Sequence, residues 1–316
     1  MIKTTAGIES SAAGLRFNQL AGLIGRTPLL DLTDLSPDPE RVRIYAKAEW
    51  FNPGGSVKDR PALWIIREAV RQNRLRPGIK LLDASSGNTA LAYAMLGAAL
   101  GYGITLFVPD NVSPLQKALL KAYGAEVIFT PAAEGSDGAI LAAQAFYRKH
   151  ADRYFYADQY NNPANWQAHY KTTASEIWRQ TRGRITHFIA GLGTSGTFVG
   201  TGRRLREYRP GIRLISVQPD SPFHGLEGLK HMPTSIVPGI YDPCVADENI
   251  TVSTEAAYDW VKRLAKEKGL LVGLSSGAAL EAVMQLARNL KEPGVLVTVF
   301  PDGGQRYLEQ KFWEEN

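Results

Sequence analysis

The stretch Ile185-Thr-His-Phe-Ile-Ala-Gly-Leu-Gly-Thr-Ser-Gly-Thr197 decides the fold class of this chain. Its first six residues are mostly apolar and have the length of a short buried strand. Three glycines follow within seven residues, and the segment from 198 to 208 is expected to form a helix. A strand, a tight loop and a helix in this order are the repeating unit of α/β proteins.

The same order recurs along most of the chain. Further apolar runs of strand length are expected at 80–84, 104–108, 126–130, 213–217 and 295–300. A helix is predicted from 60 to 72, where apolar residues recur at the spacing of one helix face. Strands that alternate with helices predict mostly parallel sheets with helices on both faces.

The length of the chain predicts two domains. It has 316 residues, and a single hydrophobic core stops growing at roughly 250–300 residues. No low-complexity linker separates two halves of the sequence, so the domains are expected to be interleaved. We therefore predict an α/β protein with two interleaved domains, each built on a mostly parallel twisted sheet flanked by helices.

Composition and charge exclude several classes of function. The net charge is +5, but no basic run or basic-aromatic stripe is present, so nucleic acid is not expected as a partner. Cys244 is the only cysteine, which excludes an intramolecular disulfide and fits a cytoplasmic protein. The five histidines lack paired spacing, and no metal site is predicted. Residues 89–108 carry no charge, but glycines interrupt them, so we expect a buried helix and strand and no membrane partner.

The loop from Gly191 to Thr197 is a candidate phosphate site. Its glycines allow a tight turn, and backbone N–H groups at a helix N-terminus bind phosphate. Three hydroxyl side chains add further donors, although a plain turn remains an alternative. The loop also fits the dinucleotide pattern G-x-G-x-x-G, which requires an acidic residue about 20 positions later. Asp220 is a loose candidate for that residue, so a nicotinamide-dependent dehydrogenase stays an alternative.

Lys58 is a candidate for covalent attachment of a cofactor. It follows the turn cluster Asn52-Pro-Gly-Gly-Ser56 and stands where the predicted helix begins. Positive charge is disfavoured at a helix N-terminus, which favours the neutral amine that Schiff-base formation requires. An ordinary solvated lysine is an equally good interpretation of this position taken alone.

Two more segments rich in hydroxyl residues stand at the predicted start of a helix. Ser85-Ser-Gly-Asn-Thr89 offers hydroxyls and N–H groups that could bind a carboxylate. In Gly273-Leu-Ser-Ser-Gly-Ala278 one serine is expected to be a helix N-cap. Neither loop is specific by itself.

Taken together and in order, these segments resemble the cysteine synthase family, which has fold type II of the pyridoxal-phosphate enzymes. The resemblance covers nearly the whole chain. Its motifs are Ile24–Leu29, Ser56–Arg60, Ser85–Thr89, Asp158–Ala164, Gly193–Thr197, Gly273–Ala278 and Arg306-Tyr307.

The resemblance implies a role for each matched residue. Lys58 would carry pyridoxal phosphate and later take the Cα proton, Asn88 would bond the ring oxygen, and Ser275 would bond the pyridine nitrogen. The cofactor phosphate would be held by Gly193, Thr194, Ser195, Gly196 and Thr197. The substrate carboxylate would be bound by Ser85, Ser86, Thr89 and Gln159. Gly239 matches a loop that approaches the substrate amine.

The implied reaction is β-replacement on O-acetyl-L-serine or O-phospho-L-serine with sulfide, giving L-cysteine. The segment Pro301-Asp-Gly-Gly-Gln305 is closer to the B-type branch, whose members accept thiosulfate and form S-sulfocysteine. Lys230 stands where O-phosphoserine-using members carry a basic residue, and a surface lysine is an equal alternative. Ala90 departs from the family, in which glycine is usual at this position.

The resemblance also implies the domain boundaries and the assembly. Residues 1–51 and 162–316 would form a larger domain that binds the cofactor, residues 52–161 a smaller mobile domain, and the protein a homodimer. Other enzymes of this fold stay open as alternatives, namely a serine or threonine dehydratase and a cystathionine β-synthase. A binding protein that keeps only the fold is a further alternative.

Overall fold

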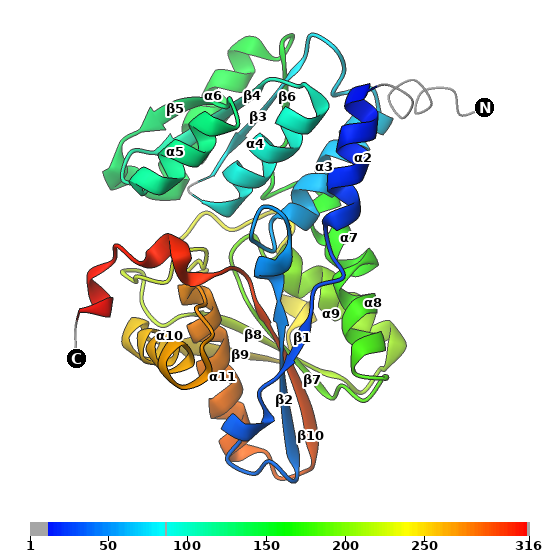
Figure 1. The fold of residues 1–316 in the computed structure, drawn as a ribbon, viewed down its shortest axis with the longest axis vertical. Helices are drawn as coiled ribbons and strands as arrows, with labels where there is room; N and C mark the ends of the chain where they lie inside the picture. The colour runs from blue at the N-terminus through cyan, green and yellow to red at the C-terminus, as the bar shows by residue number, and fades with distance from the viewer. Residues whose placement is uncertain (1–11, 86, 315–316) are drawn as a thin grey trace. The chain divides into compact units, whose positions relative to one another are not determined.

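The computed structural model describes residues 12–85 and 87–314 (Figure 1). These residues form two compact units. The first contains the described residues up to Ile24 together with Asn52–Asn165, and the second contains Gly25–Phe51 and the chain from Trp166 onward. The chain thus passes from one unit to the other three times, as the prediction of interleaved domains requires.

The first unit is built on a parallel sheet with the strand order β5-β4-β3-β6. Its strands are β3 (Lys80–Ala84), β4 (Ile104–Pro109), β5 (Glu126–Thr130) and β6 (Tyr154–Tyr156). Its helices are α2 (Ala12–Leu23), α3 (Asp59–Arg71), α4 (Asn88–Leu100), α5 (Pro114–Ala122), the 3-10 turn η3 (Ala132–Glu134) and α6 (Gly135–His150).

Successive residues of β3 and β4 point to opposite faces of this sheet, and each face is covered by helices. Leu81 and Leu106 pack in a core with α3 and α4, whereas Leu82 and Phe107 pack in a second core with α6. The central strands β3 and β4 are therefore covered on both faces, and this burial explains why β4 carries no charged residue.

The second unit is built on a sheet with the strand order β1-β2-β10-β7-β8-β9. All neighbouring strands are parallel except β1 and β2. The strands are β1 (Leu29–Asp31), β2 (Val42–Ala48), β7 (His187–Gly191), β8 (Arg213–Pro219), β9 (Glu248–Val252) and β10 (Gly294–Phe300). The α-helices that complete the chain are α7 (Ala164–Lys171), α8 (Thr173–Gln180), α9 (Gly196–Tyr208), α10 (Thr254–Lys268) and α11 (Leu274–Asn289). Short 3-10 turns are η1 (Thr33–Leu35), η2 (Glu49–Phe51), η4 (Pro243–Val245), η5 (Gly304–Tyr307) and η6 (Lys311–Trp313).

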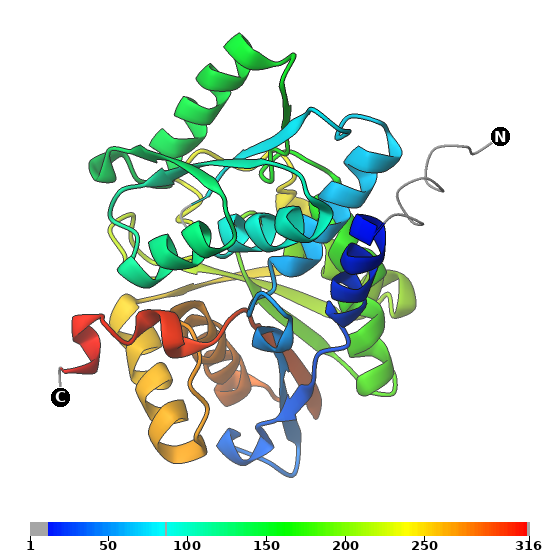
Figure 2. The same cartoon turned by 45° about the horizontal axis from the view of Figure 1, so that its top comes forward.

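Helices cover both faces of this second sheet as well. The paired helices α10 and α11, orange in Figure 2, pack in one core with β-strand residues such as Ile44 and Ile215. On the other face Phe188 of β7 stacks on Phe198 of α9 at 6.4 Å between ring centroids. The predicted α/β class with mostly parallel sheets is confirmed.

The boundaries of the units differ from the predicted domains in two places. Helix α2 packs against α4 of the first unit, although the prediction placed residues 1–51 in the larger domain. The last crossing lies at 165/166, whereas the prediction placed it at 161/162. Which unit binds the cofactor and which one moves stays a prediction.

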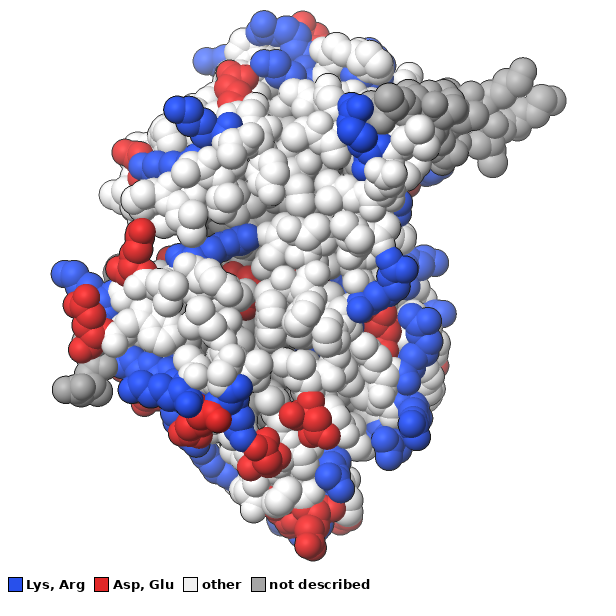
Figure 3. All heavy atoms as spheres, in the orientation of Figure 1, with Lys and Arg blue, Asp and Glu red and all other residues white. Residues whose placement is uncertain are grey.

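The uncharged stretch 89–108 is divided as expected. Most of α4 is buried all round, and the strand β4 that follows is buried at every residue. Among the described residues, no helix combines the length and apolar character needed to cross a membrane. On the face drawn in Figure 3, basic and acidic side chains lie among one another. Two of the pairs in the second unit are Arg206–Asp247 and Arg204–Glu207, each at 2.6 Å.

Candidate active site

Lys58 lies at the N-terminus of α3, where the sequence predicted it. The turn before it closes with the Gly55 N–H donating to the Asn52 carbonyl at 2.8 Å. The Asp59 carboxylate folds back and accepts the Gly54 N–H at 2.5 Å, so closely that a Cβ on Gly54 would lie 2.4 Å from an Asp59 oxygen. A larger residue at 54 would have to displace the Asp59 carboxylate, and the turn fixes the backbone from which Lys58 projects.

The loop after β3 is joined to the loop after β6. Thr89, in the first turn of α4, donates from its hydroxyl to Gln159 Oε1 at 2.8 Å. The Gln159 amide nitrogen donates to the Ala84 carbonyl at 2.8 Å, and all three residues are buried. The structure thus brings together two predicted carboxylate-binding residues that are 70 positions apart in sequence. We call Thr89 and Gln159 the Thr89–Gln159 pair below.

The remaining residues of the first loop have different surroundings. Ser85 Oγ accepts the Gly87 and Ala90 N–H groups at 3.2 and 3.3 Å, so its oxygen holds the start of α4. Both bonds use the oxygen as acceptor and leave the hydroxyl proton for another partner. Asn88 is half-buried at the first position of α4. Ser86 lies outside the described residues.

Asp83, which the sequence analysis did not single out, lies directly behind this loop on β3. Its side chain is fully buried. The pKa of the Asp83 carboxyl is raised to about 7, mainly by burial and also by the nearby Asp158 charge, while N–H donors from the backbone oppose the shift. The available signal was a carboxylate inside the apolar run of a buried strand, which is costly unless it is hydrogen-bonded.

The predicted phosphate loop lies between β7 and α9. Ser195 precedes α9 with a left-handed backbone, φ 69°. Its Oγ is buried, and within the part of the chain that the structure describes it has no hydrogen-bond partner. A Cβ on Gly193 would lie 2.2 Å from the Gly228 carbonyl oxygen, so only glycine fits there. An unsatisfied buried hydroxyl at a helix N-terminus is what a bound phosphate would satisfy.

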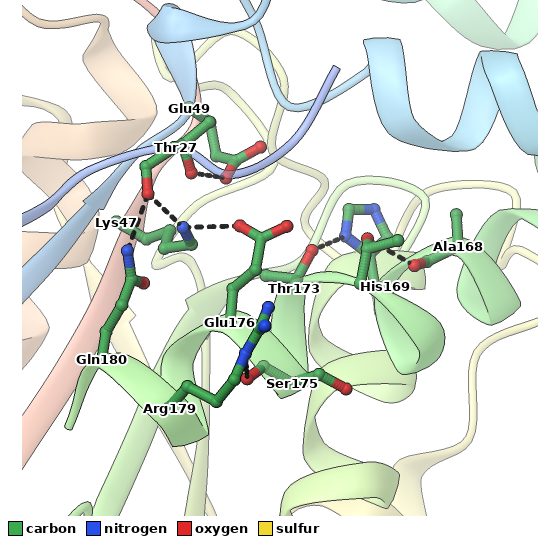
Figure 4. Close-up of polar contacts among 11 residues, drawn as sticks. Thr27, Lys47, Glu49, Ala168, His169, Thr173, Ser175, Glu176, Arg179 and Gln180 are labelled. Atoms are coloured by element: carbon green, nitrogen blue, oxygen red, sulfur yellow. Dashed lines mark hydrogen bonds and ion pairs between the residues drawn. The ribbon is translucent and has the colours of Figure 1, made fainter. Parts of the chain in front are cut away.

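The other loop residues are held from the side. Thr194 Oγ1 lies 3.4 Å from the Gly196 nitrogen and accepts its N–H. Thr197 Oγ1 lies 3.3 Å from Nε2 of the buried His169, whose Nδ1 lies 2.9 Å from the Thr173 hydroxyl. Sequence reasoning missed His169, because a lone histidine 28 residues away carries no local signal. Figure 4 shows the contact between His169 and Thr173. The two hydroxyl contacts orient the ring and, through it, Thr197.

A buried polar network underlies the same region of the second unit. Lys47 of β2 donates to the Glu176 carboxylate at 2.7 Å and to the Thr27 carbonyl at 2.6 Å. Thr27 donates from its hydroxyl to Glu49 at 2.7 Å, and Gln180 donates to the Thr27 carbonyl (Figure 4). These bonds fix α8 against the sheet, and α8 begins at the residue that holds His169.

Three further predicted residues belong to the second unit. Ser275 is buried at the second position of α11. Lys230 is buried, and its backbone N–H donates to the Leu192 carbonyl at 2.8 Å, next to the predicted phosphate loop. Gly239 is exposed in a turn closed by the Tyr241 N–H and the Pro238 carbonyl. Over the described residues, no group of three or more His, Cys, Asp or Glu side chains is arranged to hold a metal ion.

Comparison with known proteins places these features in a family. The model of the pyridoxal-phosphate dependent enzymes matches residues 20–302. The chain belongs to this family. The resemblance to the cysteine synthases is confirmed, because a cysteine synthase of Aquifex aeolicus is 54% identical over 90% of this chain and 89% of its own. Cysteine synthase B of Salmonella typhimurium is 40% identical over 92% of this chain and 94% of its own.

Solved structures agree with this assignment. A cysteine synthase of Entamoeba histolytica superposes with a TM-score of 0.89 at 34% identity, covering 94% of this chain and 90% of that one. O-ureido-L-serine synthase superposes with a TM-score of 0.87 at 37% identity, covering 94% and 95%. Fold type II is therefore confirmed, and the protein is a pyridoxal-phosphate-dependent enzyme. The alternatives of a dehydrogenase and of an idle binding protein are wrong.

The residues present fit this cofactor. The unsatisfied Ser195 hydroxyl, the glycine required at 193 and the start of α9 form a cradle for its phosphate. The individual roles of Lys58, Asn88 and Ser275 stay predictions.

Proposed function

We propose that the protein is a cysteine synthase, which replaces the β-substituent of an activated L-serine with a sulfur nucleophile. The 54% identity to a cysteine synthase over nine-tenths of the chain carries this proposal. The geometry of the first unit supports it, because two of the residues assigned to the substrate carboxylate, Thr89 and Gln159, are hydrogen-bonded to each other. The same fold also serves lyases, and the products of the reaction distinguish them.

Lys58 is the residue that we assign to the proton transfer. Pyridoxal phosphate, when bound, withdraws electrons from the Cα of an attached amino acid and so makes its proton acidic. The N-terminus of α3 disfavours the charged ammonium of Lys58. Its neutral amine then takes the Cα proton as a general base.

The second unit provides the groups assigned to the cofactor. Ser195 and the N–H groups of residues 193–197 would hold the phosphate dianion. Ser275 would place a neutral hydroxyl at the pyridine nitrogen, so that the nitrogen gains no proton from a carboxylic acid. A neutral nitrogen makes a weaker electron sink, which suits loss of a β-substituent better than a long-lived carbanion.

For the leaving group, we propose that Lys230 recognises a phosphate and that O-phospho-L-serine is a substrate alongside O-acetyl-L-serine. The Lys230 backbone is bonded to Leu192, at the start of the loop that precedes α9. A buried lysine beside an anion-binding loop is a suitable partner for a second anionic group. The B-type character of residues 301–305 supports thiosulfate as a second sulfur donor, besides sulfide.

The test is a spectrum followed by product analysis. Purified wild-type protein with pyridoxal phosphate is expected to absorb in the visible range and to change its spectrum when O-acetyl-L-serine is added. Sulfide should then yield cysteine. Release of a keto acid in place of cysteine would assign a dehydratase. A protein that stays colourless with excess pyridoxal phosphate would contradict the proposal.

Lys230→Ala tests the leaving-group assignment, with O-acetyl-L-serine as the internal control. We expect kcat/KM for O-phospho-L-serine to fall by about tenfold to a hundredfold, the range for a lost charge-assisted hydrogen bond. Activity with O-acetyl-L-serine should change little. Equal losses with both substrates, or no phosphoserine activity in the wild type, would exclude this role.

A homodimer and a cytoplasmic location are also proposed, from the resemblance and from the single cysteine respectively. Analytical ultracentrifugation of the purified protein decides the first, because a sedimenting mass of one 34.6 kDa chain excludes the dimer.

A further inference from the structure

Gln159 is held at both its backbone and its side chain. The Asp83 carboxylate accepts its backbone N–H at 3.3 Å, and Asn165 donates to its carbonyl at 2.7 Å. Ala84 accepts from its side-chain nitrogen and Thr89 donates to its side-chain oxygen, each at 2.8 Å. These four bonds leave the Gln159 amide a single orientation.

Asp83 is the charged member of this set and also binds the strand end itself. Its other oxygen accepts the Ala84 N–H at 2.9 Å. Ala84 is the residue whose carbonyl orients the Gln159 side chain. The Asp83 carboxylate thus fixes both the end of β3 and the loop that carries Gln159.

From this arrangement we propose that Asp83 is a positioning residue for the amino-acid substrate, holding the Thr89–Gln159 pair from behind β3. The inference rests on the proposed function, because it takes the substrate carboxylate to be bound by this pair. Asp83 acts through Gln159 and does not contact the reacting atoms. Its two accepted N–H bonds, one at each oxygen, favour the carboxylate, since the protonated oxygen of a carboxyl becomes a donor and a poorer acceptor.

The surroundings of Asp83 make this carboxylate sensitive to pH. Burial raises its pKa to about 7, whereas the N–H groups of Ala84 and Gln159 oppose the rise. Other groups act on it or on its neighbours: Tyr93 on α4, Tyr156 on β6, Asp158 and Tyr160 on the following loop, and Asp137 on α6. Helix α6 also carries the basic residues Arg148, Lys149 and His150 in its last turn. Strand β4 carries no titratable residue.

The sign of the effect follows from the two protonation states. Above pH 7 the ionised Asp83 accepts both N–H groups, and the Thr89–Gln159 pair stays aligned. As the pH falls through about 7, Asp83 takes up a proton, and the bond to the protonated oxygen weakens. Binding of an amino-acid carboxylate is therefore expected to weaken on acidification.

The experiment compares Asp83→Asn with wild-type holoenzyme by spectral titration with L-serine and with L-serinamide, which lacks the carboxylate. The substitution keeps the shape but loses one acceptor. We expect the dissociation constant of L-serine at pH 8 to rise about tenfold, because one hydrogen bond to a charged group is lost. The dissociation constant of L-serinamide should stay unchanged. In the wild type the serine constant should rise below pH 7, and in Asp83→Asn it should be high at every pH.

Thr105→Val serves as the matched control. Thr105 is a fully buried polar residue of the adjacent strand β4, and its hydroxyl donates to Glu126, away from Gln159. It should leave the serine-to-serinamide ratio and its pH dependence unchanged. If Asp83→Asn does not fold, the wild-type profile decides: the serine dissociation constant should rise below pH 7 while the serinamide constant does not.

The outcomes separate the two proposals. A wild type whose spectrum responds to neither amino compound contradicts the proposed function. If the wild type responds, and Asp83→Asn has the same serine-to-serinamide ratio of dissociation constants and the same pH profile, the positioning role alone is overturned. A wild-type serine constant that does not rise below pH 7 does the same.

Discussion

Removing the Ser195 hydroxyl is expected to stabilise the protein without cofactor and to weaken cofactor binding. The Oγ atom is buried, and within the described chain it has no partner. Deleting such a group relieves about 1–3 kcal/mol of desolvation. Alanine carries the same Cβ as serine, so the strain of φ 69° is unchanged. Ser195→Ala should therefore raise the melting temperature of the apoprotein by a few degrees, at roughly 2–4 °C per kcal/mol.

With pyridoxal phosphate the effect reverses. A hydroxyl that donates to a phosphate dianion contributes about 1.5–3 kcal/mol. Its loss corresponds to a dissociation constant roughly 10-fold to 150-fold higher, at 1.36 kcal/mol for each factor of ten. Calorimetry of the apoprotein measures the first effect, and titration of apoprotein with pyridoxal phosphate, followed by absorbance, measures the second.

Thr201→Val is the matched control for Ser195→Ala. Thr201 lies on the same helix, α9, and its hydroxyl is likewise buried without a partner among the described residues. Its removal should stabilise the apoprotein and leave cofactor affinity unchanged. If Ser195→Ala binds pyridoxal phosphate as tightly as wild type, or lowers the stability of the apoprotein, the reasoning about the phosphate cradle is refuted.

Three more changes test other parts of the molecule. Lys47→Met leaves Glu176 buried without its cation and should reduce the free energy of unfolding by about 3–5 kcal/mol, as measured by denaturant titration. A loss below about 1 kcal/mol would mean that the pair is not buried in solution. Gly193→Ala places a Cβ 2.2 Å from a backbone oxygen and should cost about 1–3 kcal/mol and weaken cofactor binding, whereas Gly211→Ala, which meets no atom within 4 Å, should do neither. Asp83 binds a proton up to about pH 7 in the folded state but only up to about pH 4 in the unfolded state. Its contribution to the free energy of unfolding should therefore fall by up to about 4 kcal/mol as the pH rises from 4 to 7. An Asp83→Asn variant whose unfolding depends on pH as the wild type does would contradict this.

Strands that are buried on both faces of a parallel sheet could be predicted from the sequence. Very short strands, and strands that mix apolar with charged residues, could not. Strands β3 and β4 are mostly apolar because helices cover both faces of their sheet. Strand β6 has three residues, too few for a pattern. Strand β2 contains the charged residues Arg43 and Lys47, which hide its strand pattern. Lys47 is buried because it pairs with Glu176, and the two residues are too far apart in sequence for a local pattern to show this.

The candidate site divides in the same way. The glycines and hydroxyls of residues 191–197 predicted a phosphate loop from local chemistry alone. The Thr89–Gln159 hydrogen bond joins residues 70 positions apart, and only the ordered resemblance to a family suggested that they act together. His169 and Asp83 were missed, because each acts on a predicted residue from a distant segment and neither forms a motif of its own.

Reductive trapping tests the central assignment, that Lys58 carries the cofactor, most directly. The protein is incubated with pyridoxal phosphate, reduced with borohydride so that any imine becomes a stable amine, and digested for peptide mass spectrometry. We expect one modified peptide, with the phosphopyridoxyl group on Lys58, and none from Lys58→Ala. A modification on another lysine in the wild type, or the same labelling in Lys58→Ala, would contradict the assignment.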